Sequence, residues 1–245
     1  MTQARVVIPM AAARQQPRHC SVCTVSGLCL PAGLGSAEIE RLERLMSARR
    51  RLRRGQHLYR AGDAFDSLFA IRNGFLKTDV LGEDGRDQVT GFQMAGELLG
   101  LDGIGQGHHT CNARALEDSD VCVIPYDKLE GASREIEGLQ RNLMKLLSRE
   151  IVRDHGLMML LGTMRADERL AAFLLNLSQR FMARGWSPAE FHLRMTREEI
   201  GSYLGLKLET VSRAFSRFHE DQLICVQQRH IRILDTVGLR KVLGP

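Results

Sequence analysis

The chain has no apolar run that approaches the ~20 residues of a membrane-spanning helix. An apolar stretch at 6–13 is similar to the core of an export signal, but it is short and Pro9 interrupts it, so we expect no export. The sequence also lacks a Ser/His/Asp or Cys/His set at familiar spacing. These absences predict a cytoplasmic protein that is not an enzyme.

Acidic side chains are scarce toward both ends of the chain. Residues 1–60 contain 11 basic and 3 acidic side chains, residues 61–162 contain 10 and 17, and residues 163–245 contain 13 and 9. This asymmetry within a net charge of +5 indicates that the ends, rather than the middle, meet a polyanion. An unevenly charged solvated surface explains the same counts, so charge alone does not decide.

Cysteine is sparse, yet three of the six cysteines fall within ten residues. Cys20, Cys23 and Cys29 are spaced C-x2-C-x5-C in a stretch without helical or strand periodicity, which predicts a loop that gathers thiols. In a reducing cytosol, clustered thiols favour a metal over disulfides. Structural zinc usually requires a second C-x2-C pair, whereas a cubane iron–sulfur cluster needs a fourth cysteine at no fixed spacing. Both remain open, and the available fourth ligands are His19, Cys111, Cys122 and Cys225.

The pattern of the sequence divides the 245 residues into two domains joined by a long helix. Residues 1–18 have no pattern and are expected to be disordered, and residues 19–31 are the cysteine loop. Short apolar runs between glycine-rich turns predict a β-barrel or jelly roll over 32–130. A helical period covers 131–162, and a second domain covers 163–245, so the predicted fold class is α+β.

The long predicted helix has one apolar stripe, which a small barrel cannot cover. The stripe predicts a parallel coiled coil with a second copy of the chain. Asp154 continues the stripe, and a carboxylate facing its twin across a two-fold axis opposes dimerisation. The alternative is that Asp154 pairs with an arginine of the partner at the edge of the seam. The predicted dimerisation residues are Leu143, Leu147, Ile151, Asp154, Met158 and Leu161.

The C-terminal domain is predicted to be a winged helix-turn-helix. Thr196 and Glu199 fit a capping box, Gly205 begins a tight turn, and a second helix follows over 208–219, before two short apolar runs that predict the wing.

The second helix has the polar face of a major-groove reader. The guanidinium of an arginine can donate two hydrogen bonds to guanine O6 and N7, and a glutamate can accept one from cytosine N4. Arg213, with Glu209 one turn earlier, therefore suits a G·C pair. Arg217 and Arg197 suit phosphates. A solvated face explains Glu209 and Arg213 as well, but it does not explain the surrounding turn and wing. The predicted DNA-binding residues are Glu209, Ser212, Arg213, Arg197, Ser216 and Arg217.

Beyond residue 18, nearly the whole chain resembles the FNR/ANR-type, oxygen-sensing branch of the Crp/Fnr transcription regulators. The segments that carry the resemblance are His19-Cys-x2-Cys-x5-Cys-Leu-Pro31, Thr90-Gly-Phe-Gln-Met-Ala-Gly-Glu-Leu-Leu-Gly100, Gly103-Ile-Gly-Gln-Gly-His-His109, Glu168-Arg-Leu-Ala-Ala-Phe173 and Met195-Thr-Arg-x3-Gly-x-Tyr-Leu-Gly205 with Glu209-Thr-Val-Ser-Arg213.

The resemblance implies an oxygen-labile [4Fe-4S] cluster held by three N-terminal cysteines and one at the end of the barrel. The strand motif Val-Cys-Val-Ile-Pro125 assigns the last position, so the implied ligands are Cys20, Cys23, Cys29 and Cys122. It also implies an anaerobic homodimer that becomes a monomer when the cluster is lost. That dimer would bind TTGAT-type palindromes in double-stranded DNA and activate or repress genes of anaerobic metabolism. RNA polymerase is a further implied partner, with Glu83–Arg86 at a hairpin tip as the expected contact.

Cyclic-nucleotide binding, a property of another branch of the superfamily, is not expected. Gly96-Glu97 is present, but His108-His109-Thr110 stands where that branch has an arginine followed by serine or threonine. Without the arginine, the fork that binds phosphate is lost. We interpret the tandem histidines as a loop feature, with a metal role as the alternative.

Overall fold

The computed structural model describes residues 19–82, 85 and 87–244. The predicted disordered segment 1–18 and three of the four residues of the expected polymerase contact, 83, 84 and 86, lie outside the described residues.

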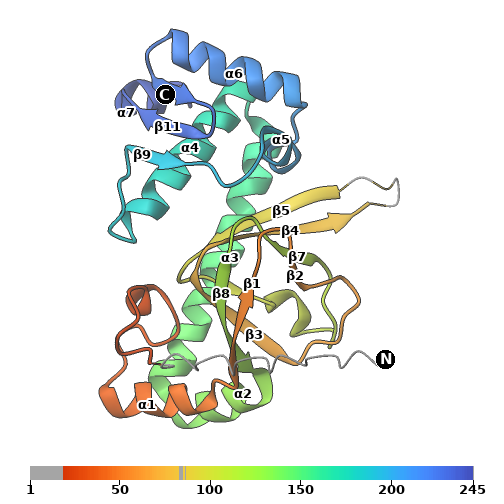
Figure 1. The fold of residues 1–245 in the computed structure, drawn as a ribbon, viewed down its shortest axis with the longest axis vertical. Coiled ribbons are helices and arrows are strands. Elements are labelled where there is room, and N and C mark those ends of the chain that lie inside the picture. The colour runs from red at the N-terminus through yellow and green to blue at the C-terminus, as the bar shows by residue number, and fades with distance from the viewer. Residues whose placement is uncertain (1–18, 83–84, 86, 245) are drawn as a thin grey trace, which may run out of the picture.

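The N-terminal domain is a jelly roll of two antiparallel four-stranded sheets, as the sequence predicts (Figure 1). One sheet has the order β1-β8-β3-β6 and the other has the order β2-β7-β4-β5. Their strands are β1 (Ala48–Leu52), β2 (His57–Tyr59), β3 (Ser67–Asn73), β4 (Phe75–Leu81), β5 (Asp87–Met94), β6 (Leu98–Leu99), β7 (Asn112–Ala115) and β8 (Ser119–Pro125). Apolar side chains that alternate along these strands fill the space between the sheets, because successive side chains of a strand point to opposite faces.

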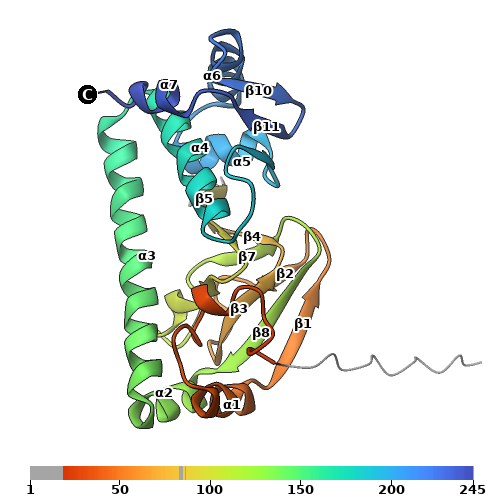
Figure 2. The same ribbon diagram turned by 90° about the vertical axis from the view of Figure 1, so that its left-hand side faces the viewer.

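Three helices cover the outer side of the β1-β8-β3-β6 sheet and its end: α1 (Ser36–Leu45), α2 (Tyr126–Glu135) and the long α3 (Glu137–Thr163). The helix predicted from residue 131 is divided, because the backbone of Ile136 is extended and ends α2. The 27 residues of α3 span about 40 Å at the usual rise per residue. Figure 2 shows α3 running alongside the jelly roll and on to the C-terminal domain.

The C-terminal domain is the predicted winged helix-turn-helix. Thr196 Oγ1 accepts a hydrogen bond from the Glu199 N–H at 3.1 Å, and Glu199 Oε2 accepts from the Thr196 N–H at 2.7 Å. Gly205 has a φ of 63°, the left-handed conformation that ends the first helix. The wing has one strand more than predicted. The elements are α4 (Ala166–Met182), β9 (Glu190–His192), α5 (Arg197–Leu204), α6 (Leu208–Glu220), β10 (Ile224–Gln227), β11 (His230–Ile233) and α7 (Thr236–Lys241).

The C-terminal domain packs directly on the β4–β5 hairpin. Ser202 of α5 accepts a hydrogen bond from the Val89 N–H at 2.8 Å and donates one to the Asp87 carbonyl at 3.0 Å. The buried Lys77 ammonium lies 3.2 Å from Glu199. Apolar side chains of the hairpin belong to the same buried cluster as the core of the C-terminal domain. The hairpin therefore fixes where the helix-turn-helix lies relative to the jelly roll. Among the helices described, none has the length and apolar character needed to cross a membrane.

Candidate metal centre and nucleic-acid interface

The cysteine loop is a chain of tight turns, as the absence of periodicity predicts. The N–H groups of Cys23, Ser26 and Cys29 each donate to the carbonyl three residues earlier, and the segment includes one short 3-10 turn, η1 (Ser26–Leu28). These turns bring the three thiols to the same side of the loop, where they line one cavity.

Side chains from two helices hold the loop at its ends. At the start, Glu43 of α1 accepts hydrogen bonds from the backbone N–H groups of Cys20 and Ser21. At the end, the buried Asn142 amide of α3 donates to the Leu30 carbonyl at 2.9 Å and to the Ala32 carbonyl at 2.7 Å. The loop is therefore tied to the long helix by hydrogen bonds.

The fourth cysteine that lines the cavity is Cys122, which lies on β8 between β1 and β3. It faces Arg49 across one strand pair and Ala70 across the other. Cys122 lines the same small cavity as Cys20, Cys23 and Cys29. Thiols that are about a hundred residues apart in the sequence therefore meet in one place.

Burial in the cavity disfavours the thiolate form of Cys20, Cys29 and Cys122 and raises the pKa of each. Burial raises the pKa of Cys20 to about 12, and the neighbouring Cys122, Glu43 and Cys23 add to the shift. Burial also raises the pKa of Cys29 to about 12 and raises that of Cys122. A metal reverses this preference, because it binds the thiolate form. All six cysteines are free thiols.

The other three residues considered as a fourth ligand lie elsewhere. The Cys111 sulfur is 3.5 Å from Asp102 in the jelly roll, and burial raises its pKa to about 12. His19 Nδ1 lies 3.3 Å from Glu43 Oε2, and Cys225 belongs to β10. Across 19–82, 85 and 87–244, no three His, Cys, Asp or Glu side chains are arranged to hold a single metal ion. The four cysteines thus line one cavity without forming a site for a single metal ion in the described part of the chain.

The tandem histidines are part of the jelly-roll loop. The His109 ring is buried and stacks on Tyr59, with ring centroids 3.6 Å apart, and its Nδ1 is 3.5 Å from Asp102 Oδ1. His108 is exposed, and its Nδ1 lies 3.0 Å from the Gln106 carbonyl. This geometry agrees with the interpretation of the histidines as a loop feature.

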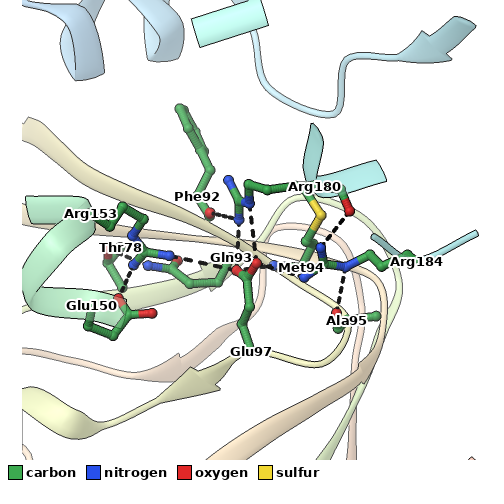
Figure 3. A network of polar contacts seen from close by, with 10 residues as sticks. All are labelled: Thr78, Phe92, Gln93, Met94, Ala95, Glu97, Glu150, Arg153, Arg180 and Arg184. Atoms are coloured by element: carbon green, nitrogen blue, oxygen red, sulfur yellow. Dashed lines mark hydrogen bonds and ion pairs between the residues drawn. The ribbon is translucent and has the colours of Figure 1, made fainter. Parts of the chain in front are cut away.

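One carboxylate joins the jelly roll to both long helices (Figure 3). Glu97 accepts hydrogen bonds from Arg180 Nη2 of α4 at 2.7 Å and from Arg184 Nη2, in the turn after that helix, at 2.6 Å. Arg153 of α3 lies 3.7 Å from the same carboxylate and also pairs with Glu150. Burial alone would raise the pKa of Glu97, but the three arginines outweigh it and hold the pKa below its ordinary value. Sequence reasoning did not find this network.

The predicted reading face of α6 is open to solvent. Val211, Phe215 and Phe218 are buried against the domain core, as the helical period predicts. The five residues predicted on the opposite face are all exposed: Glu209, Ser212, Arg213, Ser216 and Arg217.

Two arginines expected to hold phosphates have partners within the chain. Arg197 is half-buried, with its guanidinium carbon 3.2 Å from the centre of the Phe215 ring, and burial lowers its pKa to about 10. Arg217 is exposed but forms an ion pair with Asp167 at the start of α4. Either side chain would have to leave its present partner before its whole guanidinium could bind a phosphate.

The predicted dimer stripe on α3 divides into two parts. Leu143 is buried in the chain's own core and Leu147 packs against that core, so Leu143 is not available on the outer face. Ile151, Asp154 and Met158 are exposed, and Leu161 is half-buried at the end of the helix. The exposed apolar part of the stripe therefore begins at Ile151.

Comparison with known proteins gives matches to both domains. A cyclic nucleotide-binding domain matches residues 49–135, and a Crp-like helix-turn-helix domain matches residues 168–242. The solved structure of FixK2 from Bradyrhizobium japonicum has a TM-score of 0.74 at 28% identity, covering 81% of this chain and 98% of that chain.

Curated relatives match over most of the length. The transcriptional regulatory protein btr of Bordetella pertussis is 47% identical over 92% of this chain and 93% of that protein. The transcriptional activator protein Anr of Pseudomonas protegens is 44% identical over 92% of this chain and 93% of that protein. The fumarate and nitrate reduction regulatory protein of Escherichia coli K12 is 43% identical over 92% of this chain and 90% of that protein.

Proposed function

Because the chain belongs to the Crp/Fnr family of transcription regulators, and specifically resembles its FNR-type members, we propose that it is an oxygen-responsive regulator that holds a [4Fe-4S] cluster with Cys20, Cys23, Cys29 and Cys122. Members of this family bind DNA, act as dimers and are not enzymes. The observation that carries the cluster assignment is that these four thiols line one cavity.

The residues present fit such a cluster. A cubane distributes its four thiolates over four iron atoms, so its ligands surround a space, whereas the ligands of one zinc ion converge on a point. The four cysteines line one cavity, and among the described residues no three His, Cys, Asp or Glu side chains could hold a single metal ion. Arg72 also lines the cavity, and its buried Nη1 has no hydrogen-bond partner in the described part of the chain. This unpaired hydrogen-bond donor suits a negatively charged ligand.

When bound, the cluster supplies an oxygen-sensitive link between the loop and β8. The chain's own residues connect that link to α3, because Asn142 binds the end of the loop through two carbonyls. An ordered loop therefore stabilises the position of α3, on which Asp154 lies between the exposed Ile151 and Met158. We infer that this offsets the repulsion between two Asp154 carboxylates in the dimer, and that loss of the loop's anchor favours monomers.

The output is DNA binding by α6. Its exposed Glu209, Ser212 and Arg213 are proposed to read TTGAT-type half-sites, one half-site for each protomer of the dimer. RNA polymerase is the proposed protein partner. No cyclic nucleotide is proposed as a ligand, and the bonds from Arg180 and Arg184 to Glu97 support this, because they occupy the carboxylate of the Gly96-Glu97 segment.

Anaerobic purification tests the cluster. We expect a brown protein with about four iron and four sulfide per chain, the stoichiometry of the cluster, and loss of both after exposure to air. Cys122→Ser is expected to abolish iron binding, and the matched variant Cys111→Ser is expected to retain it, because Cys111 lies beside Asp102 outside the cavity. A colourless protein that contains zinc, or equal iron loss in both variants, would contradict the assignment.

A further inference from the structure

Arg72 differs from every other side chain that lines the cysteine cavity. Besides the four thiols, the described wall consists of apolar groups, Ser26 and Pro31, and Arg72 is its one charged side chain. A guanidinium is always protonated in a protein, so it brings a fixed positive charge to this apolar wall.

The backbone explains why Arg72 points there. In the pairing of β3 with β8, Ile71 faces Val121 and Asn73 faces Asp120, so the register shifts and Arg72 is the extra residue. This bulge follows Ala70, which faces Cys122 and lines the same cavity, so the alternation of side chains along β3 places Arg72 on that face of the sheet. The bulge is held on one side by Ile71, whose N–H donates to the Glu97 carbonyl at 2.9 Å and whose carbonyl accepts from the Gly96 N–H at 2.7 Å.

The buried end of Arg72 lacks a partner. Nη1 is buried and has no hydrogen bond to any residue that the structure describes, although the Asp120 carboxylate is near in register and itself has one buried oxygen without a partner. Leaving a buried charged donor unpaired is costly, so such groups in proteins usually face a ligand, an ion or water.

We propose that Arg72 is a positioning residue for the cluster, with Nη1 donating a hydrogen bond to a sulfur atom in the cavity and its charge offsetting the thiolate ligands. This inference rests on the proposed function and deepens it. Four thiolates leave the site with net negative charge, and hydrogen bonds to the sulfurs, together with net charge, govern how firmly a protein holds a cluster.

Two measurements on Arg72→Met test the proposal, because the variant is expected to hold its cluster less firmly without any loss of stability of the apoprotein. Reconstituted without oxygen, the variant is expected to release iron to a ferrous chelator about 10–100-fold faster than the unaltered protein, if the loss of affinity usual for such a supporting residue appears in the release rate. The apoprotein of the same variant is expected to melt at the same temperature or higher, because methionine removes an unpaired buried charge. A merely structural arginine would lower the melting temperature instead.

Matched variants make the result specific. Arg72→Lys keeps the charge and should recover part of the slow release, and Arg53→Met, an exposed position on the same domain that does not line the cavity, should behave like the unaltered protein. Equal release rates for Arg72→Met and the unaltered protein would overturn the role of Arg72 and leave the cluster standing. An unaltered protein without iron and sulfide would overturn both.

Discussion

Glutamine in place of Glu97 should destabilise the protein far more than a single surface change. The carboxylate accepts bonds at 2.6 and 2.7 Å from two arginines, and a third lies 3.7 Å away. Glutamine removes the negative charge and turns an N–H₂ group toward guanidinium donors, so that at least one bond becomes a donor–donor contact. Because 18% of the Glu97 side chain is exposed, we take the lower end of the range for breaking a buried ion pair, about 3 kcal/mol.

The assay is calorimetric melting of the apoprotein at neutral pH. For a chain of this size, about 3 kcal/mol corresponds to a drop in melting temperature of roughly 6–12 °C. The matched control is Glu137→Gln, because Glu137 is 83% exposed and pairs with Arg141 one turn along the surface of α3. Its expected effect is below about 0.5 kcal/mol. Equal shifts in the two variants would refute the reasoning.

Acid provides a second check of the same interaction. The arginines hold the folded-state pKa of Glu97 below the ordinary value of 4.5. A group with a lowered pKa contributes its full stabilisation above the unfolded-state value, and this is lost as the pH falls through the folded-state value. The difference in melting temperature between the unaltered protein and Glu97→Gln should therefore be constant above pH 4.5 and shrink below it. A difference that grew on acidification would contradict the charge argument.

Three further predictions test the proposed dimerisation, DNA binding and link between the cysteine loop and α3. Asp154→Ala should form dimers in air, measured by sedimentation velocity, and a monomeric variant would remove Asp154 from the explanation. Arg213→Ala should weaken binding to a TTGAT site by about 1–3 kcal/mol, the value of one bidentate base contact, in a fluorescence anisotropy titration; an equal loss on scrambled DNA would argue against base reading. Asn142→Ala should retain its four iron atoms, the cluster's proposed number, but dimerise more weakly, whereas unchanged dimerisation would show that the loop reaches α3 by another contact.

The features that the sequence could predict are those encoded by neighbours in the chain. The capping box of Thr196 and Glu199 and the turn at Gly205 involve residues within a few positions of one another, so the pattern specifies the geometry. The buried face of α6 follows from the helical period in the same way. The cysteine spacing predicted the loop, but its chemistry alone could not choose between zinc and a cluster or assign the fourth thiol.

The features that the sequence could not predict depend on distant packing. Glu97 meets Arg180 and Arg184 across more than eighty residues, and only the docking of α4 on the jelly roll brings them together. The packing of α5 on α6 places Arg197 over Phe215, and the packing of α3 on the N-terminal domain buries Leu143 in the chain's own core, although helical periodicity treats both as outward-facing. The hydrophobic periodicity of one helix does not indicate which neighbouring helix or strand packs against each of its ends.

Two contacts of the cysteine loop lead to the same helix. Leu28 packs so closely on Gly96 that a Cβ there would lie 3.0 Å from it, and the next residue, Glu97, contacts Arg153 in the middle of α3. At its other end the loop binds Asn142, about three turns earlier on the same helix. A rigid helix held at two points cannot shift at one without disturbing the other. We therefore expect the order of the loop and the position of the face that carries Asp154 to be coupled by contacts within a single chain.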